Sequence, residues 1–281
     1  MGLMCLLSNT AVGEQVQYSR EQYERLVRCS RKEAIGEWNG WRASNPAEEI
    51  RLQGAELADM KLDGCNLTGA NLRGAILYKA RLNEARLTGA ILDGTDLREV
   101  QLSRAHLMGA SLREITGDGV HFERADLTDA NLAGVRIQPA YFDSALLKRS
   151  NLAGAKLENA RMPSVRLIDA DLSSTHLARA TLTNAQIRGS DLSGSDMNGA
   201  DLINATVTET EMKGANLEFT ELSGAVFKDS DLRGVNLAAS VQRATVFFGI
   251  DLRGADFRMA MVDSFTRFVE CKFDEYTDFR G

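Results

Sequence analysis

Two of the three histidines lie at a spacing that suits acid–base chemistry. His106 precedes Asp126 by twenty residues, and His176 precedes Asp196 by the same interval. A carboxylate that orients a histidine is half of the arrangement that activates a nucleophile. However, the chain has no GxSxG, HExxH, GxxxxGK(S/T) or CxxC motif. We therefore interpret both pairs as solvated surface residues and predict that the protein is not an enzyme.

Metal and cofactor motifs are also incomplete. The segment 229–234 begins like a calcium-binding loop, but Arg233 stands where a ligand belongs and no glutamate occupies the twelfth place. The run Gly117-Asp118-Gly119 lacks the third glycine of a dinucleotide fingerprint. The sequence therefore predicts no metal site and no cofactor.

Composition narrows the class of protein. The chain has 281 residues, of which 44% are hydrophobic and 26% charged, as in folded globular proteins. The formal net charge of -6 argues against direct binding of nucleic acid. No run of eighteen apolar residues predicts a transmembrane segment. The four cysteines are widely separated, which favours a reducing, cytoplasmic location.

The N-terminal part divides into two segments. Residues 1–18 are expected to form a flexible tail, and residues 19–45 an amphipathic helix that caps the rest of the chain. Ser19 and Gln22 match a capping box, and apolar residues that include Trp38 and Trp41 recur every three or four positions. The basic opposite face is also typical of helices that bind membranes or acidic partners. We favour the cap, which places both tryptophans on the following domain, residues 46–281.

A repeat of five residues dominates the chain from Leu52 to Val262. Every fifth residue of that span is apolar at 41 of 43 positions, and 29 of these are leucine. The residue two places earlier is alanine or another small or aliphatic residue. In an α-helix five residues turn the side chain by about 140°, so the leucines would face every direction. In extended chain, residues two apart share a face, and a corner in each quintet turns both inward. Glycine is frequent at the expected corner.

The pattern A(D/N)LXX resembles that of the pentapeptide-repeat family. It is carried by quintets such as ANLRG at 70–74, ANLAG at 130–134 and SDLRG at 230–234. The resemblance implies an all-β repeat solenoid, a right-handed quadrilateral parallel β-helix with four quintets per coil. Forty-three quintets then form about eleven coils, with a rod length on the order of 50 Å.

Residues twenty apart should therefore stack, which predicts the core pairs Phe122 with Phe142 and Phe227 with Phe247. Two inward positions break the pattern. At Gly117 the missing volume should be filled by Ile115 and Val120, and at Gln242 a buried amide predicts a local bulge over residues 241–244. We expect the first exception to be compensated and the second to distort the coil.

Outward positions supply the candidate interaction surfaces. One column of acids is expected at successive coils, with a neighbouring acidic set beside it, and Lys213, Arg233 and Arg253 are placed to neutralise part of it. The acidic candidates are Asp171, Asp191, Glu211, Asp231 and Asp251 in the column and Asp196, Asp201, Glu221 and Asp256 beside it. The candidate C-terminal association patch comprises Val241, Val246, Phe248, Met259 and Met261, with Phe268, Phe273 and Phe279 as an alternative hydrophobic end-cap.

Three functional hypotheses follow. The first is a non-enzymatic scaffold that mediates protein–protein interaction through flat polar faces, with an unidentified protein partner. The resemblance implies a second, a DNA-mimicking regulator of DNA gyrase that confers quinolone or toxin resistance, because some family members bind type II topoisomerases as homodimers joined through their C-terminal coils. The third is a bacterial effector associated with the membrane through its N-terminal segment.

Overall fold

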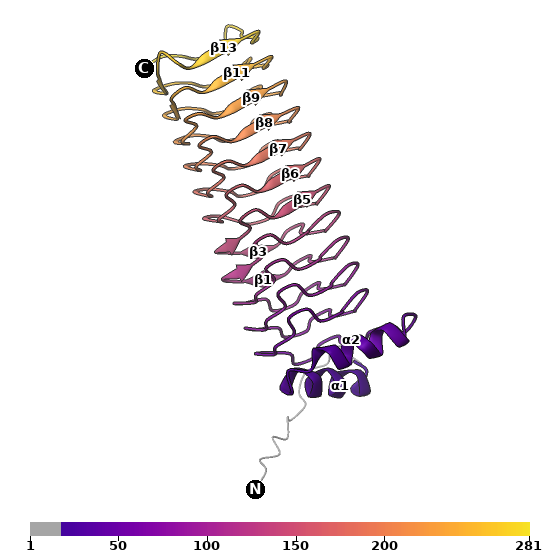
Figure 1. Cartoon of the computed structure of the whole chain (residues 1–281). Coiled ribbons are helices and arrows are strands. Elements are labelled where there is room, and N and C mark those ends of the chain that lie inside the picture. Colours follow the sequence, from indigo (N-terminus) through magenta and orange to yellow (C-terminus); the bar gives the residue numbers. More distant parts are fainter. Residues whose placement is uncertain (1–17) are drawn as a thin grey trace, which may run out of the picture.

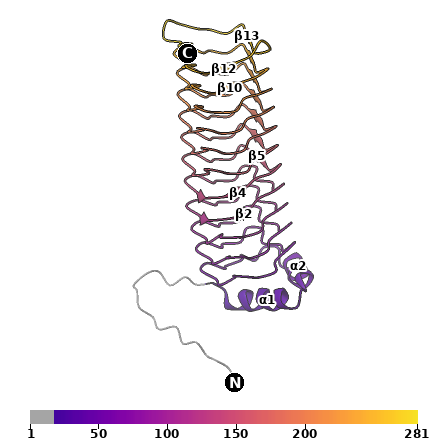
Figure 2. The ribbon, with the colours of Figure 1, turned by 90° about the vertical axis from the view of Figure 1, so that its left-hand side faces the viewer.

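The computed structural model describes residues 18–281, and the expected flexible tail lies outside this range apart from Tyr18. Two helices are followed by a straight stack of coils, with the helices at one end and the C-terminus at the other (Figures 1 and 2). The helices are α1 (Arg20–Arg31) and α2 (Ile35–Ser44). The strands are β1 (Thr116–Gly117), β2 (Val120–His121), β3 (Arg136–Ile137), β4 (Ala140–Tyr141), β5 (Leu146–Lys148), β6 (Arg166–Ile168), β7 (Gln186–Arg188), β8 (Thr206–Thr208), β9 (Val226–Lys228), β10 (Val241–Gln242), β11 (Val246–Phe248), β12 (Met261–Val262) and β13 (Arg267–Val269).

Each coil contains twenty residues. The parallel bridges that start at Arg51 and end at Lys272 take eleven steps, and the first ten are each twenty residues long. Along one side the extended pieces are long enough to form a seven-stranded parallel sheet in the order β13-β11-β9-β8-β7-β6-β5. The predicted parallel solenoid, with four quintets per coil, is therefore confirmed.

The backbone of each quintet is paired with the coils on both sides. In one quintet the N–H of Asn71 donates to Ile50 in the preceding coil, and the N–H of Leu72 donates to Ile91 in the following coil. The corner residue has a left-handed backbone whether it is Gly89 (φ 64°) or Glu84 (φ 59°). At both corners the N–H donates to the next coil, so this bond contributes to holding a non-glycine residue in a strained conformation.

The core is a continuous column of side chains. The inward leucines and alanines are almost entirely buried, and the predicted rings are stacked, with centroids 5.0 Å apart for Phe122 and Phe142 and 5.1 Å for Phe227 and Phe247. A Cβ added at Gly117 would lie 2.9 Å from Val120 Cγ2, which shows that the valine occupies the missing volume. The expected compensation at Gly117 is confirmed for Val120, whereas no atom of Ile115 is among the three nearest to that point.

The bulge predicted at residues 241–244 is absent. β10 pairs in regular register with β12, and Gln242 lies opposite Val262. The amide of Gln242 is fully buried: its Nε2 donates to Ser240 Oγ at 2.9 Å, whereas its Oε1 has no partner within residues 18–281. That prediction was wrong because the ladder hydrogen bonds keep the coil regular around one unsatisfied atom. The register gains its extra residue later, between β12 and β13, where Val246 pairs with Arg267.

The capping segment is helical, but it forms two helices rather than one, separated by Lys32–Ala34, where Glu33 has a left-handed φ of 53°. Ser19 accepts from the N–H of Gln22, as the capping box predicts. The side chain of Gln22 does not return to Ser19. Its Oε1 instead accepts from the N–H of Arg51, and its Nε2 donates to the carbonyl of Glu49.

Other polar side chains of the cap meet the first coil in the same way. Asn39 Nδ2 donates to the carbonyl of Gly64 at 3.0 Å, and its Oδ1 accepts from the N–H of Asn66 at 2.8 Å. Trp38 is fully buried, and its Nε1 donates to the carbonyl of Asn66. Ser30 Oγ accepts from the N–H of Lys61. The helices therefore replace part of the backbone pairing that a preceding coil would supply.

Candidate functional site

The outward Asp or Asn before each inward leucine has a structural role in the quintet. Its side-chain oxygen accepts a hydrogen bond from the N–H two residues later, at 3.0 Å in Asp171, 2.8 Å in Asp191 and 3.0 Å in Asn131. This is an Asx turn, which both residue types can form. The corner therefore does not require a negative charge at this position, and the choice of Asp over Asn depends on something else.

The first five acidic candidates form one continuous column. Asp171, Asp191, Glu211, Asp231 and Asp251 are joined by successive parallel bridges, and we call them the acidic column. Neighbouring strands lie about 4.8 Å apart, so like charges at successive coils repel one another. The structure thus brings these five residues together as the sequence predicts.

Only one end of the acidic column is neutralised. Arg233 donates to both carboxylate oxygens of Asp231, and Arg253 does the same for Asp251. These side-chain hydrogen bonds hold the pKa of both carboxylates below the ordinary range for aspartate. No ion pair among residues 18–281 includes the other three acids of the column, Asp171, Asp191 and Glu211.

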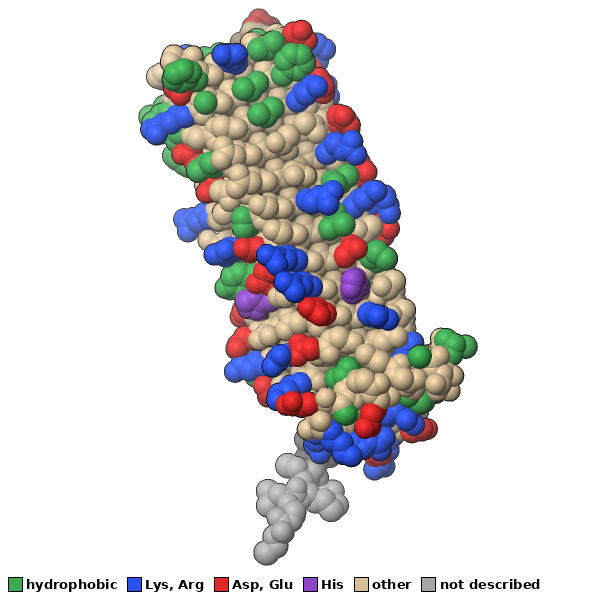
Figure 3. Space-filling model, viewed as in Figure 1, with side chains coloured by type: hydrophobic (Ala, Val, Ile, Leu, Met, Phe, Trp, Pro, Cys, Tyr) green, Lys and Arg blue, Asp and Glu red, His purple; other side chains and the backbone are tan. Residues whose placement is uncertain are grey.

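Earlier coils arrange their charges differently. Arg113 pairs with Asp93 at 3.0 Å, and Arg149 pairs with Asp129 at 2.6 Å, in each case across adjacent coils. Opposite charges therefore stack in this part of the rod, whereas like charges stack in the acidic column. Figure 3 shows acids and bases interspersed over one face of the coils.

The four neighbouring acids do not share one column. Asp196 and Asp256 belong to a column in which Asn216 and Asn236 stand between them, whereas Asp201 and Glu221 are direct neighbours in another. The amide of Asn216 donates to Asp196 at 3.0 Å. The nine acidic candidates therefore lie in three columns, of which only the acidic column is an unbroken series of more than two acids.

The candidate C-terminal patch is partly exposed. Met259 and Met261 are 72% and 55% exposed, whereas Val241, Val246 and Phe248 are half-buried because the terminal coil covers them. The sequence interpretation missed a further group of exposed apolar residues beside it: Phe219, Val262, Phe265 and Tyr276. Phe219 occupies a corner, a position that is usually outward. Val262 is the last inward position of the regular repeat, and Phe265 and Tyr276 follow the end of that repeat.

The aromatic alternative is also present. Phe268 stacks on Phe247 with centroids 4.9 Å apart, and Phe279 stacks on Phe257 at 4.7 Å. Phe273 contacts both Phe268 and Phe279 edge-on. These rings end the core column, and Phe273 and Phe279 remain 43% and 49% exposed. The C-terminal end of the rod is therefore covered by an incompletely buried aromatic layer, near which apolar side chains gather (Figure 3).

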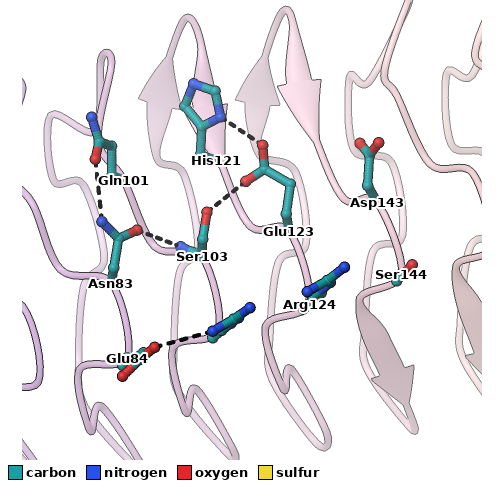
Figure 4. A pocket seen from close by; sticks show the side chains of 10 residues that line it. Asn83, Glu84, Gln101, Ser103, His121, Glu123, Arg124, Asp143 and Ser144 are labelled. Carbon is teal, nitrogen blue, oxygen red and sulfur yellow. Dashed lines mark hydrogen bonds and ion pairs between the residues drawn. The ribbon is translucent and has the colours of Figure 1, made fainter.

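A polar groove of about 740 Å³ runs across the coils that contain residues 83–144. Within it Ser103 Oγ donates to Glu123 at 2.8 Å, and His121 Nδ1 lies 2.7 Å from the other oxygen of the same carboxylate (Figure 4). Burial alone would raise the pKa of Glu123, but the hydrogen bonds from His121 and Ser103 outweigh it and lower the pKa. The sequence signals were the two-residue spacing of His121 and Glu123 and the twenty-residue spacing of Ser103 and Glu123, and both were missed.

This cluster has the wrong connectivity for a nucleophile. In a catalytic triad the histidine lies between the serine and the acid, so that it takes the serine proton. Here Glu123 lies between Ser103 and His121. His106 and His176 do stack in register with Asp126 and Asp196, but both histidines are exposed and no hydrogen bond among residues 18–281 joins either pair. The hydrogen bonds around Glu123 therefore hold the Ser103 and His121 side chains in place, but they do not give the Ser103 hydroxyl a histidine base.

Metal sites and membrane-spanning helices belong to other classes of function. Residues 18–281 contain no group of histidine, cysteine and acidic residues arranged to hold a metal ion. Within the same residues, neither helix has the length and apolar character needed to span a membrane.

Known proteins provide an independent comparison. The family model described as pentapeptide repeats matches in eight copies over residues 50–89, 80–116, 125–162, 140–177, 164–199 and 200–238. No curated protein matches the chain.

Several solved structures are similar. HetL, a pentapeptide repeat protein involved in heterocyst differentiation regulation in the cyanobacterium Nostoc sp. strain PCC 7120, is 33% identical over 72% of this chain and 86% of its own, with a TM-score of 0.28. QnrB1, a plasmid-mediated fluoroquinolone resistance protein, is 15% identical over 64% of this chain and 92% of its own, with a TM-score of 0.44. A pentapeptide repeat protein of the Arabidopsis thaliana thylakoid lumen is 28% identical over 34% of this chain and 67% of its own, with a TM-score of 0.33.

The family model covers more than half of the chain, and its matches fall on the quintets that build the coils. The chain therefore belongs to the pentapeptide-repeat family.

Proposed function

We propose that the protein is a non-enzymatic scaffold that binds a protein partner through the acidic column. The observation that supports this proposal is the series of three acids, Asp171, Asp191 and Glu211, that stack at successive coils without an ion pair among residues 18–281. Stacked like charges cost some tenths of a kcal/mol each, and asparagine would form the same turn without that cost. A cationic surface on the partner relieves the repulsion and gives the column its specificity.

The chain allows this proposal to be tested with nearly isosteric variants. In Asp191→Asn with Glu211→Gln, two charges are removed and the asparagine retains the turn hydrogen bond. The matched control is Glu56→Gln with Asp126→Asn, which removes the same charge from two turns on earlier coils whose acids also lack an ion pair among residues 18–281. Immobilised wild-type protein and the control should retain the same partner from cell extract, as identified by mass spectrometry, and the column variant should lose it. Equal retention by all three proteins would contradict the proposal.

A second candidate function is regulation of DNA gyrase by mimicry of DNA. The acidic column favours it, because a regular linear series of negative charges is the feature of DNA that proteins bind without reading sequence. A supercoiling assay with titrated protein tests this candidate. Inhibition or protection of gyrase at micromolar protein, lost in the column variant and retained in the control, supports mimicry. Unchanged supercoiling removes gyrase as a target and leaves the scaffold proposal intact.

The exposed C-terminal end supports a further part of the proposal, a homodimer joined through the terminal coils. Met261 and Phe265 are 55% and 68% exposed, and the aromatic layer beside them is incompletely buried. Exposed apolar patches of this kind mark interaction surfaces. Light scattering after size-exclusion chromatography should give twice the chain mass for wild type and the chain mass for Met261→Glu with Phe265→Glu.

The control for self-association places the same charges elsewhere. Ile76 and Met108 are also exposed, at 40% and 42%, and they lie on coils far from the C-terminus. Their double substitution by glutamate should leave the dimer unchanged. A wild-type protein that stays monomeric at high micromolar concentration would contradict the proposed dimer.

A further inference from the structure

The end of the rod opposite the aromatic layer carries a groove. Two adjoining hollows of about 360 and 280 Å³ share Val27 and Arg31 as lining residues. One runs along α1, and the other lies between α1 and residues 58–61 of the first coil. Tyr23, Val27 and Met60 are half-buried and form an apolar floor.

The charges that line this groove are unequal. Of its three acids, Glu24 pairs with Arg20 and Glu33 with Lys61, which leaves Asp59 against three unpaired bases. Arg28, Arg31 and Lys32 are exposed, and no ion pair among residues 18–281 includes them. The remaining basic residues of α1, Arg20 and Arg25, each pair with a glutamate four positions away. Basic side chains gather over α1 in the space-filling view (Figure 3). Positive charge in the last turn of a helix stabilises the helix, but that effect does not require an apolar hollow beside it.

The groove does not belong to the capping function of the helix. The face of α1 that closes the first coil consists of buried residues, Gln22, Leu26, Cys29 and Ser30. Gln22 Oε1 and Ser30 Oγ accept hydrogen bonds from the backbone N–H groups of Arg51 and Lys61 in the first coil, and these bonds fix that face. The groove side of α1 is therefore held in a defined position without being needed for closure, which gives a preformed binding surface.

We propose that this groove binds an acidic peptide segment of a partner protein. One apolar side chain of the peptide lies between Val27 and Met60, and its carboxylates face Arg28, Arg31 and Lys32. The concave shape favours an inserted peptide side chain rather than a membrane. A membrane would lie across exposed apolar residues on a convex face. This surface is separate from the acidic column, so the inference does not depend on the proposed scaffold function.

Fluorescence anisotropy with three labelled peptides tests the proposal on the intact protein. The probes are a Leu-Phe pair flanked by glutamates, the same peptide with Ala-Ala in the centre, and the same peptide with lysines in place of the glutamates. The first should bind, the second more weakly, and the third not at all, with affinity for the first falling as salt is raised. Equal binding of all three probes, or binding of none, would overturn the proposal.

Substitutions assign the binding to the groove. Arg28→Glu with Arg31→Glu should weaken binding of the first probe about tenfold or more. Arg73→Glu with Arg86→Glu, which changes the same charge at exposed positions on the coils, should leave binding unchanged. Met60→Ala tests the apolar floor without altering charge. Loss of binding in the coil control, or flotation of the protein with anionic vesicles in place of peptide binding, contradicts the proposal.

Discussion

At the scale of single residues, Gly117 shows how neighbouring inward positions exchange volume. Val120 Cγ2 lies 2.9 Å from the point that a Cβ of residue 117 would occupy, and the backbone of Leu97 is 3.2 Å from the same point. We predict that Gly117→Ala destabilises the protein by about 1–3 kcal/mol because neither neighbour can yield easily. Adding Val120→Ala should recover part of this loss, as measured by urea unfolding of the two single variants and the double variant. Strictly additive effects would mean that the two positions do not share the space.

Gln242 is the opposite case, since its polar group is buried without full compensation. Its Oε1 has no partner among residues 18–281, and its column neighbours are Leu222 and Val262. We predict that Gln242→Leu raises the free energy of unfolding by about 1–3 kcal/mol, because an unsatisfied buried amide is removed. Gln242→Glu should destabilise strongly, since it buries a charge. A loss of stability in the leucine variant would show that the bond to Ser240 outweighs the orphaned oxygen.

At the scale of elements, the cap depends on a few side chains that imitate backbone groups. Asn39 is the clearest, because its amide both donates to Gly64 and accepts from Asn66. We predict that Asn39→Ala lowers stability by about 1–3 kcal/mol. Hydrogen exchange should speed up at Asn66 and its neighbours while the central coils stay protected, because repeat proteins contact only adjacent units. Faster exchange along the whole rod would show that the cap and the coils unfold as one unit.

The regular coils could be predicted from sequence because the same pattern of inward and corner residues recurs in each quintet. With one inward pair and one corner in five residues, the inward leucine and the small residue two places before it are buried in the same way in each quintet. Gly117 is consistent with this pattern, because Val120 fills the volume that a larger residue would occupy. The break between α1 and α2 was not predicted, because the left-handed Glu33 carries no glycine signal. The bulge at Gln242 was predicted wrongly, because the cost of one buried amide was set above the cost of disturbing the hydrogen bonds of a coil.

The candidate surfaces were predictable only in part. Stacking of the acidic column follows from the twenty-residue coil, and the structure reproduces it from Asp171 to Asp251. The polar groove around Glu123 and the basic groove beside Val27 depend on where long side chains lie, which a repeat pattern does not specify. The exposed apolar residue Phe265 follows the last regular quintet, so the repeat pattern does not predict where its side chain lies.

At the scale of the whole molecule, the ion pairs on the surface of the rod make its stability depend on pH. The pKa values of Asp231 and Asp251 lie below the ordinary value of about 3.9 because Arg233 and Arg253 donate to them. These pairs therefore stabilise the fold above that pH, and the contribution disappears as pH falls through the lowered pKa values. We predict that Arg233→Gln with Arg253→Gln lowers stability at pH 7, by about 0.2–1 kcal/mol per exposed pair, and lowers it by less at pH 2. Urea midpoints at the two pH values check this, and a pH-independent difference would assign the loss to packing.

At the N-terminal end, backbone groups of the first coil are hydrogen-bonded to side chains of the cap, those of Gln22, Ser30, Trp38 and Asn39. A second molecule in a filament would need the same backbone groups for pairing. Head-to-tail addition of rods is thereby blocked, although parallel coils with exposed edges are otherwise suited to fibre growth. Two rods that met through their C-terminal aromatic layers would present the helix-capped ends outward. In the proposed dimer, assembly through the coil edges would therefore stop at two molecules.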